Sequence, residues 1–332
     1  MLGSCDRPLS EAYDVAVLDL DGVVYIGPSP VPGAPEALNA AQSGGMQLAF
    51  VTNNAGRSPE TVGEQLRGFG IDAHDDDVVT SAQAAARLLA DQLPEGSRVY
   101  VIGGDGLVRA LRERGLEPVT DPGAEPVGVV QGYGPEMPWK QVVQGAILVA
   151  EGLPWVATNT DMTFPTATGT GPGNGALVEL VARHAQREPQ VAGKPQRPLF
   201  EETLLRVGGE RPLVIGDRLD TDIEGAVTMG WDSLLVLTGV TGLAELVAAG
   251  PDVRPTYVAP DLATLSEPQP AAEITAEGVA LGGWSATVSD DTLQVTGEGD
   301  PADWWRVVAE AAWRHLDETG QPVGTDGVTP PG

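Results

Sequence analysis

Short apolar runs alternate with helical patterns along most of the chain. The runs that predict strands cover residues 14–19, 47–51, 98–102, 127–131, 154–158, 190–192, 212–215, 233–237 and 256–258. The patterns that predict helices cover residues 34–42, 59–70, 81–92, 106–114, 138–151, 175–186, 198–207 and 220–229. Since strands and helices alternate in this way, the sequence predicts an α/β fold with a mostly parallel sheet.

The C-terminal part of the chain follows a different pattern. Clustered prolines at 266–270 favour extended chain and predict a linker. Beyond the linker the sequence predicts a β-hairpin and then a helix, at 284–288, 292–296 and 301–318. We therefore expect a small α+β module over residues 271–320, with its tryptophans in a core against the hairpin. The Gly- and Pro-rich residues 321–332 are expected to form a disordered tail.

Charge is the strongest feature of the composition. The chain has 47 acidic and 19 basic side chains, which gives a net charge of −28 at pH 7. So acidic a surface repels phosphate backbones and anionic lipid, and we expect neither nucleic acid nor a membrane as partner. No apolar run approaches the roughly 18 residues that a membrane span needs. An anionic substrate would require a metal ion or a well-placed cation.

Cysteine and histidine are scarce, with one Cys and three His in the chain. This excludes a disulfide framework and a zinc cluster and disfavours a Cys–His dyad. No basic and apolar leader pattern precedes Cys5, so we expect a cytoplasmic protein. Any chemistry must therefore fall to carboxylates, hydroxyls or a lysine.

Carboxylates follow two of the expected strands. Asp19 and Asp21 come at the end of the first strand, and Asp217 and Asp222 follow the strand at 212–215. Acidic side chains at neighbouring strand ends form a hard-oxygen pocket that suits Mg²⁺. Taken singly, each acidic segment has another interpretation. The acids at the first strand end could simply be solvated, and those after the strand at 212–215 could complement a helix dipole.

Two further strand ends carry groups that suit a phosphate. Lys194, one of only two lysines in the chain, follows the strand at 190–192. Thr52, Asn53 and Asn54 follow the second strand and offer a hydroxyl and two amides. A solubilising lysine and ordinary turn chemistry are the alternative interpretations.

Taken in chain order, these residues resemble the four motifs of the haloacid dehalogenase-like (HAD) superfamily. The matching positions are Asp19, Asp21, Thr52, Lys194, Asp217, Thr221 and Asp222. Several other stretches resemble the nitrophenylphosphatase-type branch: 157–161, 172–176 and 237–240. The resemblance implies a Rossmann-like catalytic core over 11–82 and 190–266, with a large inserted α/β cap of the C2 type over 83–189.

The resemblance also implies a mechanism. It makes Asp19 the nucleophile that forms an aspartyl-phosphate, and Asp21 the group that protonates the leaving oxygen and then deprotonates the hydrolytic water. It places Mg²⁺ on Asp19, the main-chain carbonyl of Asp21 and Asp217, with Asp222 in support. Phosphoryl transfer depends mainly on positioning and charge neutralisation, which agrees with this set.

The remaining residues are implied to bind substrate. Lys194 and Thr52 would hold the phosphoryl oxygens, together with Asn53 and Asn54. The implied activity is Mg²⁺-dependent hydrolysis of a small phosphomonoester, with glycerol 3-phosphate or 2-phosphoglycolate expected and nitrophenyl phosphate as an artificial substrate. A nucleotide monophosphate or sugar phosphate phosphatase, and a non-catalytic phospho-metabolite sensor, are the alternatives. Related caps pair, so a homodimer through the cap is also expected.

Overall fold

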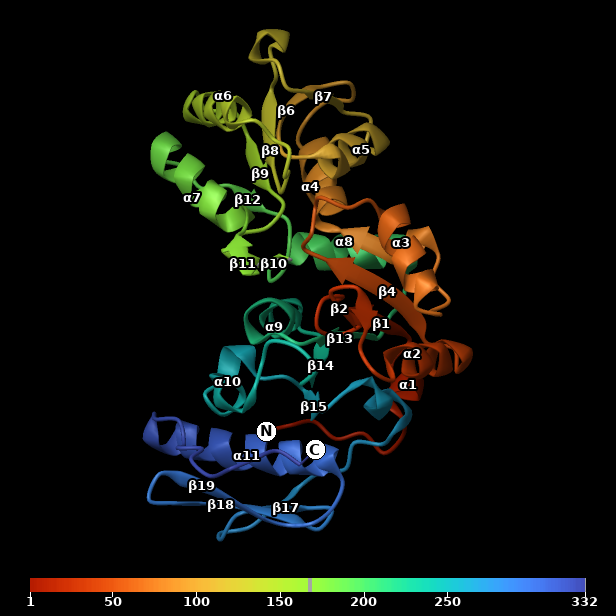
Figure 1. The fold of residues 1–332 in the computed structure, drawn as a ribbon, viewed down its shortest axis with the longest axis vertical. Coiled ribbons are helices and arrows are strands. Elements are labelled where there is room, and N and C mark those ends of the chain that lie inside the picture. The colour runs from red at the N-terminus through yellow and green to blue at the C-terminus, as the bar shows by residue number, and fades with distance from the viewer. Residues whose placement is uncertain (167–168, 332) are drawn as a thin grey trace. The chain divides into compact units, whose positions relative to one another are not determined.

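The computed structural model describes residues 1–166 and 169–331 and shows an α/β protein, as the sequence predicts (Figure 1). Its contacts divide the chain into two compact units. The first unit contains residues 1–50, 66–73 and 208–332, and the second contains 51–65 and 74–207. In the described ranges, no helix is both long enough and apolar enough to cross a membrane.

A parallel sheet forms the centre of the first unit. The first five strands of this six-stranded sheet lie in the order β15 (Tyr257–Ala259), β14 (Asp232–Val236), β13 (Pro212–Gly216), β1 (Val15–Leu18) and β4 (Gln47–Thr52), and β5 (Val78–Thr80) is the sixth. The apolar runs are continuous because both faces of such a sheet are buried. Leu18 pairs with Ile215, so β1 and β13 end side by side and their following residues share one edge of the sheet.

Helices and short hairpin strands complete the α/β part of this unit. They are α1 (Leu9–Ala12), β2 (Tyr25–Ile26), β3 (Ser29–Pro30), α2 (Ala34–Ser43), α9 (Glu224–Met229) and α10 (Leu243–Val247). The helix expected over 220–229 is interrupted, because Leu219–Ile223 form a π-helical turn before α9 begins. This turn carries Asp222.

The C-terminal module also belongs to the first unit. Four antiparallel strands follow one another in the sheet, namely β16 (Glu273–Ile274), β17 (Val279–Leu281), β18 (Trp284–Ser289) and β19 (Thr292–Gly297). The β18–β19 pairing confirms the expected hairpin. Helix α11 (Pro301–Thr319) contacts this sheet on one side and β15 on the other (Figure 1).

The tryptophans of α11 are buried, as expected, but their core is larger than the hairpin. Trp313 is 1% exposed, and its indole N–H donates to the carbonyl oxygen of Leu246 in α10 at 2.8 Å. Trp304 and Trp313 share one hydrophobic cluster with Leu235 and Val258 of the parallel sheet. The module and the α/β part therefore have a common core.

The described part of the expected tail, residues 321–331, makes specific contacts. Val323 is buried, and the main chain of Gly324 pairs with residues of the β18–β19 hairpin: its N–H donates to Asp291 O and its carbonyl accepts from Leu293 N–H. The structure differs here from the expected disorder, because the chain adds to the edge next to β19. Gly332 lies outside the described residues.

The second unit has its own parallel sheet, in the order β12 (Gln190–Val191), β9 (Trp155–Ala157), β8 (Gly128–Gln131), β6 (Arg98–Ile102) and β7 (Glu117–Val119). The other elements of this unit are α3 (Pro59–Gly68, shared with the first unit), β5 (Val78–Thr80), α4 (Ser81–Ala90), α5 (Asp105–Glu113), α6 (Trp139–Ala150), β10 (Thr163–Thr166), β11 (Gly169–Pro172), α7 (Asn174–Ala185) and α8 (Arg197–Val207). The sequence predicts most of these elements but not the β10–β11 hairpin. The boundaries 83 and 189 of the cap stay a prediction.

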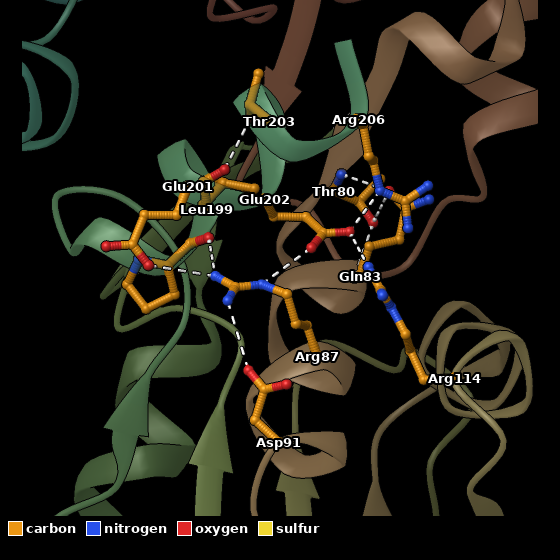
Figure 2. Close-up of polar contacts among 11 residues, drawn as sticks. Thr80, Gln83, Arg87, Asp91, Arg114, Leu199, Glu201, Glu202, Thr203 and Arg206 are labelled. Carbon is orange, nitrogen blue, oxygen red and sulfur yellow. Dashed lines mark hydrogen bonds and ion pairs between the residues drawn. The ribbon is translucent and has the colours of Figure 1, made fainter. Parts of the chain in front are cut away.

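A buried acidic residue joins three helical segments of the second unit (Figure 2). The Glu202 side chain, from α8, is fully buried and forms ion pairs with Arg87 of α4, Arg114 at the end of α5 and Arg206 one turn along α8. The Arg87 Nε to Glu202 Oε2 distance is 3.0 Å. The neighbouring Glu201 is 40% exposed and pairs with Arg87 at 3.4 Å.

We expect Glu202→Ala to lower the free energy of unfolding by about 3 kcal/mol, because three partly buried guanidinium groups would lose their common partner. Glu201→Ala is the matched control in the same helix, and its exposed pairs predict a loss of at most about 1 kcal/mol. Urea denaturation of both variants measures the difference. Equal losses for the two variants would show that burial of Glu202 does not matter.

Candidate active site

Three carboxylates converge at one edge of the parallel sheet in the first unit. Asp19 follows β1, Asp217 follows β13, and Asp222 lies in the π-helical turn behind it. One oxygen atom from each lies within 4.8 Å of the others, and Asp217 and Asp222 are 0% and 1% exposed. Such closely spaced anions repel one another in a buried site unless a cation neutralises them. This oxygen donor set fits Mg²⁺.

Asp21 lies beside this group on a tight turn. The N–H of Val24 donates to Leu20 O at 2.9 Å, and the N–H of Gly22 donates to Tyr25 O at 2.8 Å. Gly22 has φ +90°, and a Cβ there would lie 2.5 Å from the Asp217 Oδ2 atom. Only glycine fits this position. The turn leaves the Asp21 carboxylate exposed and outside the group of three.

A loop after β14, within the stretch 237–240 that resembles the nitrophenylphosphatase-type branch, binds both acidic segments. The N–H of Val240 donates to Asp217 Oδ2 at 2.7 Å, and the Thr238 hydroxyl donates to Gly22 O at 2.5 Å. A Cβ at Gly239 would approach Asp217 Oδ2 to 2.0 Å, so the loop lies directly against the carboxylate. Hydrogen bonds of this kind fix the orientation of a metal ligand.

We expect Thr238→Val to weaken Mg²⁺ binding about tenfold, because the loop would lose its bond to the Gly22 carbonyl next to Asp21. Thr238→Ser keeps the hydroxyl and is the matched control. Titration calorimetry with Mg²⁺ measures the affinity without substrate. An unchanged affinity in the Val variant would mean that the loop does not position the ligands.

The second unit contains the expected phosphate-binding residues. Thr52 ends β4 and is 5% exposed; its Oγ1 accepts the N–H of Asn54 at 3.0 Å, which leaves the hydroxyl proton to donate. The Asn54 side-chain oxygen accepts the N–H of Gly56 at 2.9 Å. This turn therefore sets the orientation of the Thr52 hydroxyl.

Lys194 is 4% exposed and its main chain is bound by Asn53. The Lys194 N–H donates to Asn53 Oδ1 at 2.8 Å, and Asn53 Nδ2 donates to Lys194 O at 3.1 Å. A Cβ at Gly193 would approach Asn53 Oδ1 to 2.5 Å, so a glycine is required before the lysine. The side chain of Asn53, expected to contact substrate, is thus directed at protein groups.

Two residues after β9, to which the sequence motifs assign no role of their own, also bond to Asn53. Asn159 Nδ2 donates to the carbonyl of Asn53 at 2.7 Å, and Asp161 accepts from Asn53 Nδ2 at 3.2 Å on each carboxylate oxygen. Both lie in the stretch 157–161, which resembles the nitrophenylphosphatase-type branch. That resemblance was the only signal for them.

Family models match three parts of the chain. Residues 16–117 match a haloacid dehalogenase-like hydrolase model, and residues 191–265 match a second, HAD-hydrolase-like model. Residues 281–329 match a GCN5-related N-acetyltransferase-like domain. The third match covers part of the C-terminal module, for which the sequence motifs suggested no family.

Similar proteins that are named as phosphatases cover three quarters or more of the chain. D-glycerol 3-phosphate phosphatase from Mycobacterium tuberculosis is 38% identical over 92% of this chain and 88% of its own length. A crystal structure of glycerol phosphate phosphatase from that organism, in complex with magnesium, has a TM-score of 0.85 over 96% of this chain and 94% of the other. p-Nitrophenyl phosphatase from Archaeoglobus fulgidus is 30% identical, with a TM-score of 0.71 over 76% and 98% of the two chains.

The chain therefore belongs to the haloacid dehalogenase-like hydrolases. Within them it is a phosphomonoester hydrolase of the nitrophenylphosphatase-type branch, with Mg²⁺ as its cofactor.

An anionic acyl-donor cofactor does not fit the helix N-terminus of the C-terminal module. The Asp300 side chain already accepts the N–H of Ala302 at 2.8 Å there. Burial, and then the charges of Asp300, Asp261 and Asp303, raises the pKa of Glu267. Because acidic side chains cluster at this end of α11, they would repel the phosphate groups of such a cofactor. The match to an N-acetyltransferase-like domain therefore does not indicate acetyl transfer by this module.

Proposed function

We propose that the protein hydrolyses glycerol 3-phosphate or 2-phosphoglycolate through an aspartyl-phosphate on Asp19. The observation that carries this proposal is the convergence of Asp19, Asp217 and Asp222 in a protein 38% identical to a glycerol 3-phosphate phosphatase. A sugar phosphate is the second candidate, since acid sugar phosphatase from Staphylococcus aureus is 35% identical over 75% of this chain. The phosphatase names of the relatives disfavour a non-catalytic sensor.

The proposed reaction has two displacements at phosphorus. An Asp19 oxygen attacks in line, and the bond from phosphorus to the alcohol oxygen breaks as Asp21 gives that oxygen its proton. Asp21 then takes a proton from water, the water oxygen bonds to phosphorus, and the bond to Asp19 breaks. Phosphate leaves and both carboxylates return to their initial state.

Charge neutralisation is the second part of the proposal. When bound by Asp19, Asp217 and the Asp21 carbonyl, Mg²⁺ supplies positive charge that lets an anionic nucleophile approach a phosphoryl group. Asp222 positions this set from the π-helical turn. The Lys194 ammonium and the Thr52 hydroxyl would hold the phosphoryl oxygens, with further donors from Asn54.

A panel of small phosphomonoesters, assayed with and without Mg²⁺, tests the proposed function. We expect kcat/KM to be highest for glycerol 3-phosphate or 2-phosphoglycolate and activity to vanish in EDTA and return with Mg²⁺. Higher kcat/KM for a sugar phosphate would support the second candidate. Full activity in metal-free enzyme would contradict the proposed site.

We also propose that the protein forms a homodimer through the expected cap. A groove between α6 and α7 has exposed apolar side chains: Trp139, Val143, Ile147 and Leu180. Glu179 and Arg183 line the same groove one turn apart, so a two-fold arrangement could pair the acid of one copy with the arginine of the other. Light scattering should show a dimer, and Leu180→Arg a monomer. The net charge of −28 disfavours nucleic acid and membranes as partners, and their absence stays a prediction, as does a cytoplasmic location.

A further inference from the structure

The C-terminal module contacts the helix that follows the loop on Asp217. Helix α11 packs against α10 (Figure 1), and the Trp313 indole N–H donates to the carbonyl oxygen of Leu246 in α10 at 2.8 Å. Trp313 and Leu246 are both buried, with exposed fractions of 1% and 0%. Because a buried carbonyl group that loses its donor is costly, this hydrogen bond fixes the position of α10 against α11.

Arg254 forms a second connection between α11 and the chain just after α10. Its guanidinium lies 5.2 Å from the centroid of the Trp313 ring, and its Nε atom donates to the carbonyl oxygen of Ala249 at 3.0 Å. The Asp317 carboxylate of α11 accepts from both terminal nitrogens of Arg254, at 2.8 and 2.7 Å. The module therefore holds α10 by one carbonyl group within the helix and by another just beyond its end.

The loop that leads into α10 is bound to Asp217. The N–H of Val240 donates to Asp217 Oδ2 at 2.7 Å, and the N–H of Thr241 donates to Asp217 O at 3.1 Å. Gly242 alone separates Thr241 from α10, and its carbonyl oxygen accepts the Leu246 N–H at 3.0 Å. Since a single residue separates the loop from the helix, a shift of α10 also shifts the donors that hold Asp217.

The segment that carries Asp222 packs on the same apolar core. Ile223 follows Asp222 in the π-helical turn, is 0% exposed, and shares one hydrophobic cluster with Trp313 and Leu246. Two of the three carboxylates that fit Mg²⁺ therefore lie on segments that are held by a core to which α11 contributes.

We infer that the C-terminal module positions the metal-binding acids, and that Trp313 is a positioning residue that acts on Asp217 through α10. The inference rests on the proposed function, in which Asp217 binds Mg²⁺. Residues behind a metal ligand hold it in the orientation that the ion requires. Without the Trp313 N–H, α10 and the loop before it can adopt other positions. The binding-competent arrangement is then less populated, which lowers the apparent affinity for Mg²⁺.

A purely structural role of the module makes a different prediction. If α11 only covers apolar surface, the loss of a hydrogen bond anywhere in the module lowers stability and leaves the affinity for Mg²⁺ unchanged. Trp284 provides a matched control, because its indole N–H donates to the carbonyl oxygen of Asp300 at 2.9 Å, within the module. Trp313→Phe and Trp284→Phe each remove one such bond, and only the first bond reaches α10.

Titration calorimetry with Mg²⁺, on the whole chain and without substrate, measures the affinity. We expect Trp313→Phe to bind Mg²⁺ about fivefold more weakly than wild type, and Trp284→Phe to bind it as wild type does. Arg254→Met removes the donor to Ala249 O and should weaken Mg²⁺ binding by a smaller factor. Coupling between two sites is reciprocal, so Mg²⁺ should also slow amide hydrogen exchange in residues 243–249 of the wild type.

Equal Mg²⁺ affinities of Trp313→Phe and Trp284→Phe would overturn the inference, as would exchange in residues 243–249 that Mg²⁺ does not change. If Trp313→Phe does not fold, the comparison of Arg254→Met with Trp284→Phe decides by the same criterion. Asp217→Asn distinguishes this failure from that of the proposed site. Mg²⁺ binding as tight as in wild type by that variant would show that the metal site itself is wrong, whereas a loss of binding leaves the site standing.

Discussion

Asp19→Asn should lower kcat by about 10⁴-fold or more while the protein stays folded, because the amide is nearly isosteric but is neither nucleophilic nor anionic. Asp19 lies beside Asp217 and Asp222 in the group that fits Mg²⁺, so the substitution should also lower the affinity for Mg²⁺. Steady-state kinetics on glycerol 3-phosphate measures the first effect, and calorimetry with Mg²⁺ the second.

Asp252→Asn is a suitable control for this variant. Asp252 is exposed in the short turn Pro251–Val253, and its substitution changes the net charge by the same amount. Circular dichroism checks that both variants are folded. Activity of Asp19→Asn within tenfold of wild type would exclude Asp19 as the nucleophile.

Asp21→Asn should lower kcat on glycerol 3-phosphate by about 10²- to 10⁴-fold, since the alcohol oxygen would leave without a proton. The loss should be much smaller on nitrophenyl phosphate, because nitrophenolate is a good leaving group and needs little protonation. The exposed position of Asp21, outside the group of three buried or half-buried acids, is consistent with a group that exchanges protons with substrate and water.

The comparison of the two substrates within the Asp21→Asn variant needs no separate control for folding, since a folding defect lowers both rates equally. Equal losses on the alkyl and the aryl ester would argue against the acid role of Asp21.

The sequence predicts the acidic part of the site well because parallel strands end at a common edge. Asp19 and Asp217 follow two apolar runs, and pairing of Leu18 with Ile215 is enough to bring them together. The same argument placed Thr52 and Lys194 at strand ends. These inferences need only strand positions, which the apolar pattern supplies.

Contacts between loops could not be predicted in this way. The bond from Thr238 to Gly22 and that from Asn53 to Asp161 join segments far apart in sequence, and neither leaves a periodic pattern. Glu202 is another example, because a glutamate within a helix normally faces solvent and only its arginine partners explain its burial. The tryptophans of α11 predicted a core but not that it includes the parallel sheet.

The most direct test of the account is to find the phosphoryl group on the enzyme. Asp21→Asn enzyme with Mg²⁺ and nitrophenyl phosphate should accumulate the intermediate, because deprotonation of the hydrolytic water is slowed. After acid quench and borohydride reduction, which converts an aspartyl-phosphate to homoserine, peptide mass spectrometry should locate the modification at Asp19. Release of phosphate with no modification at Asp19, or with modification of another residue, would contradict the proposed mechanism.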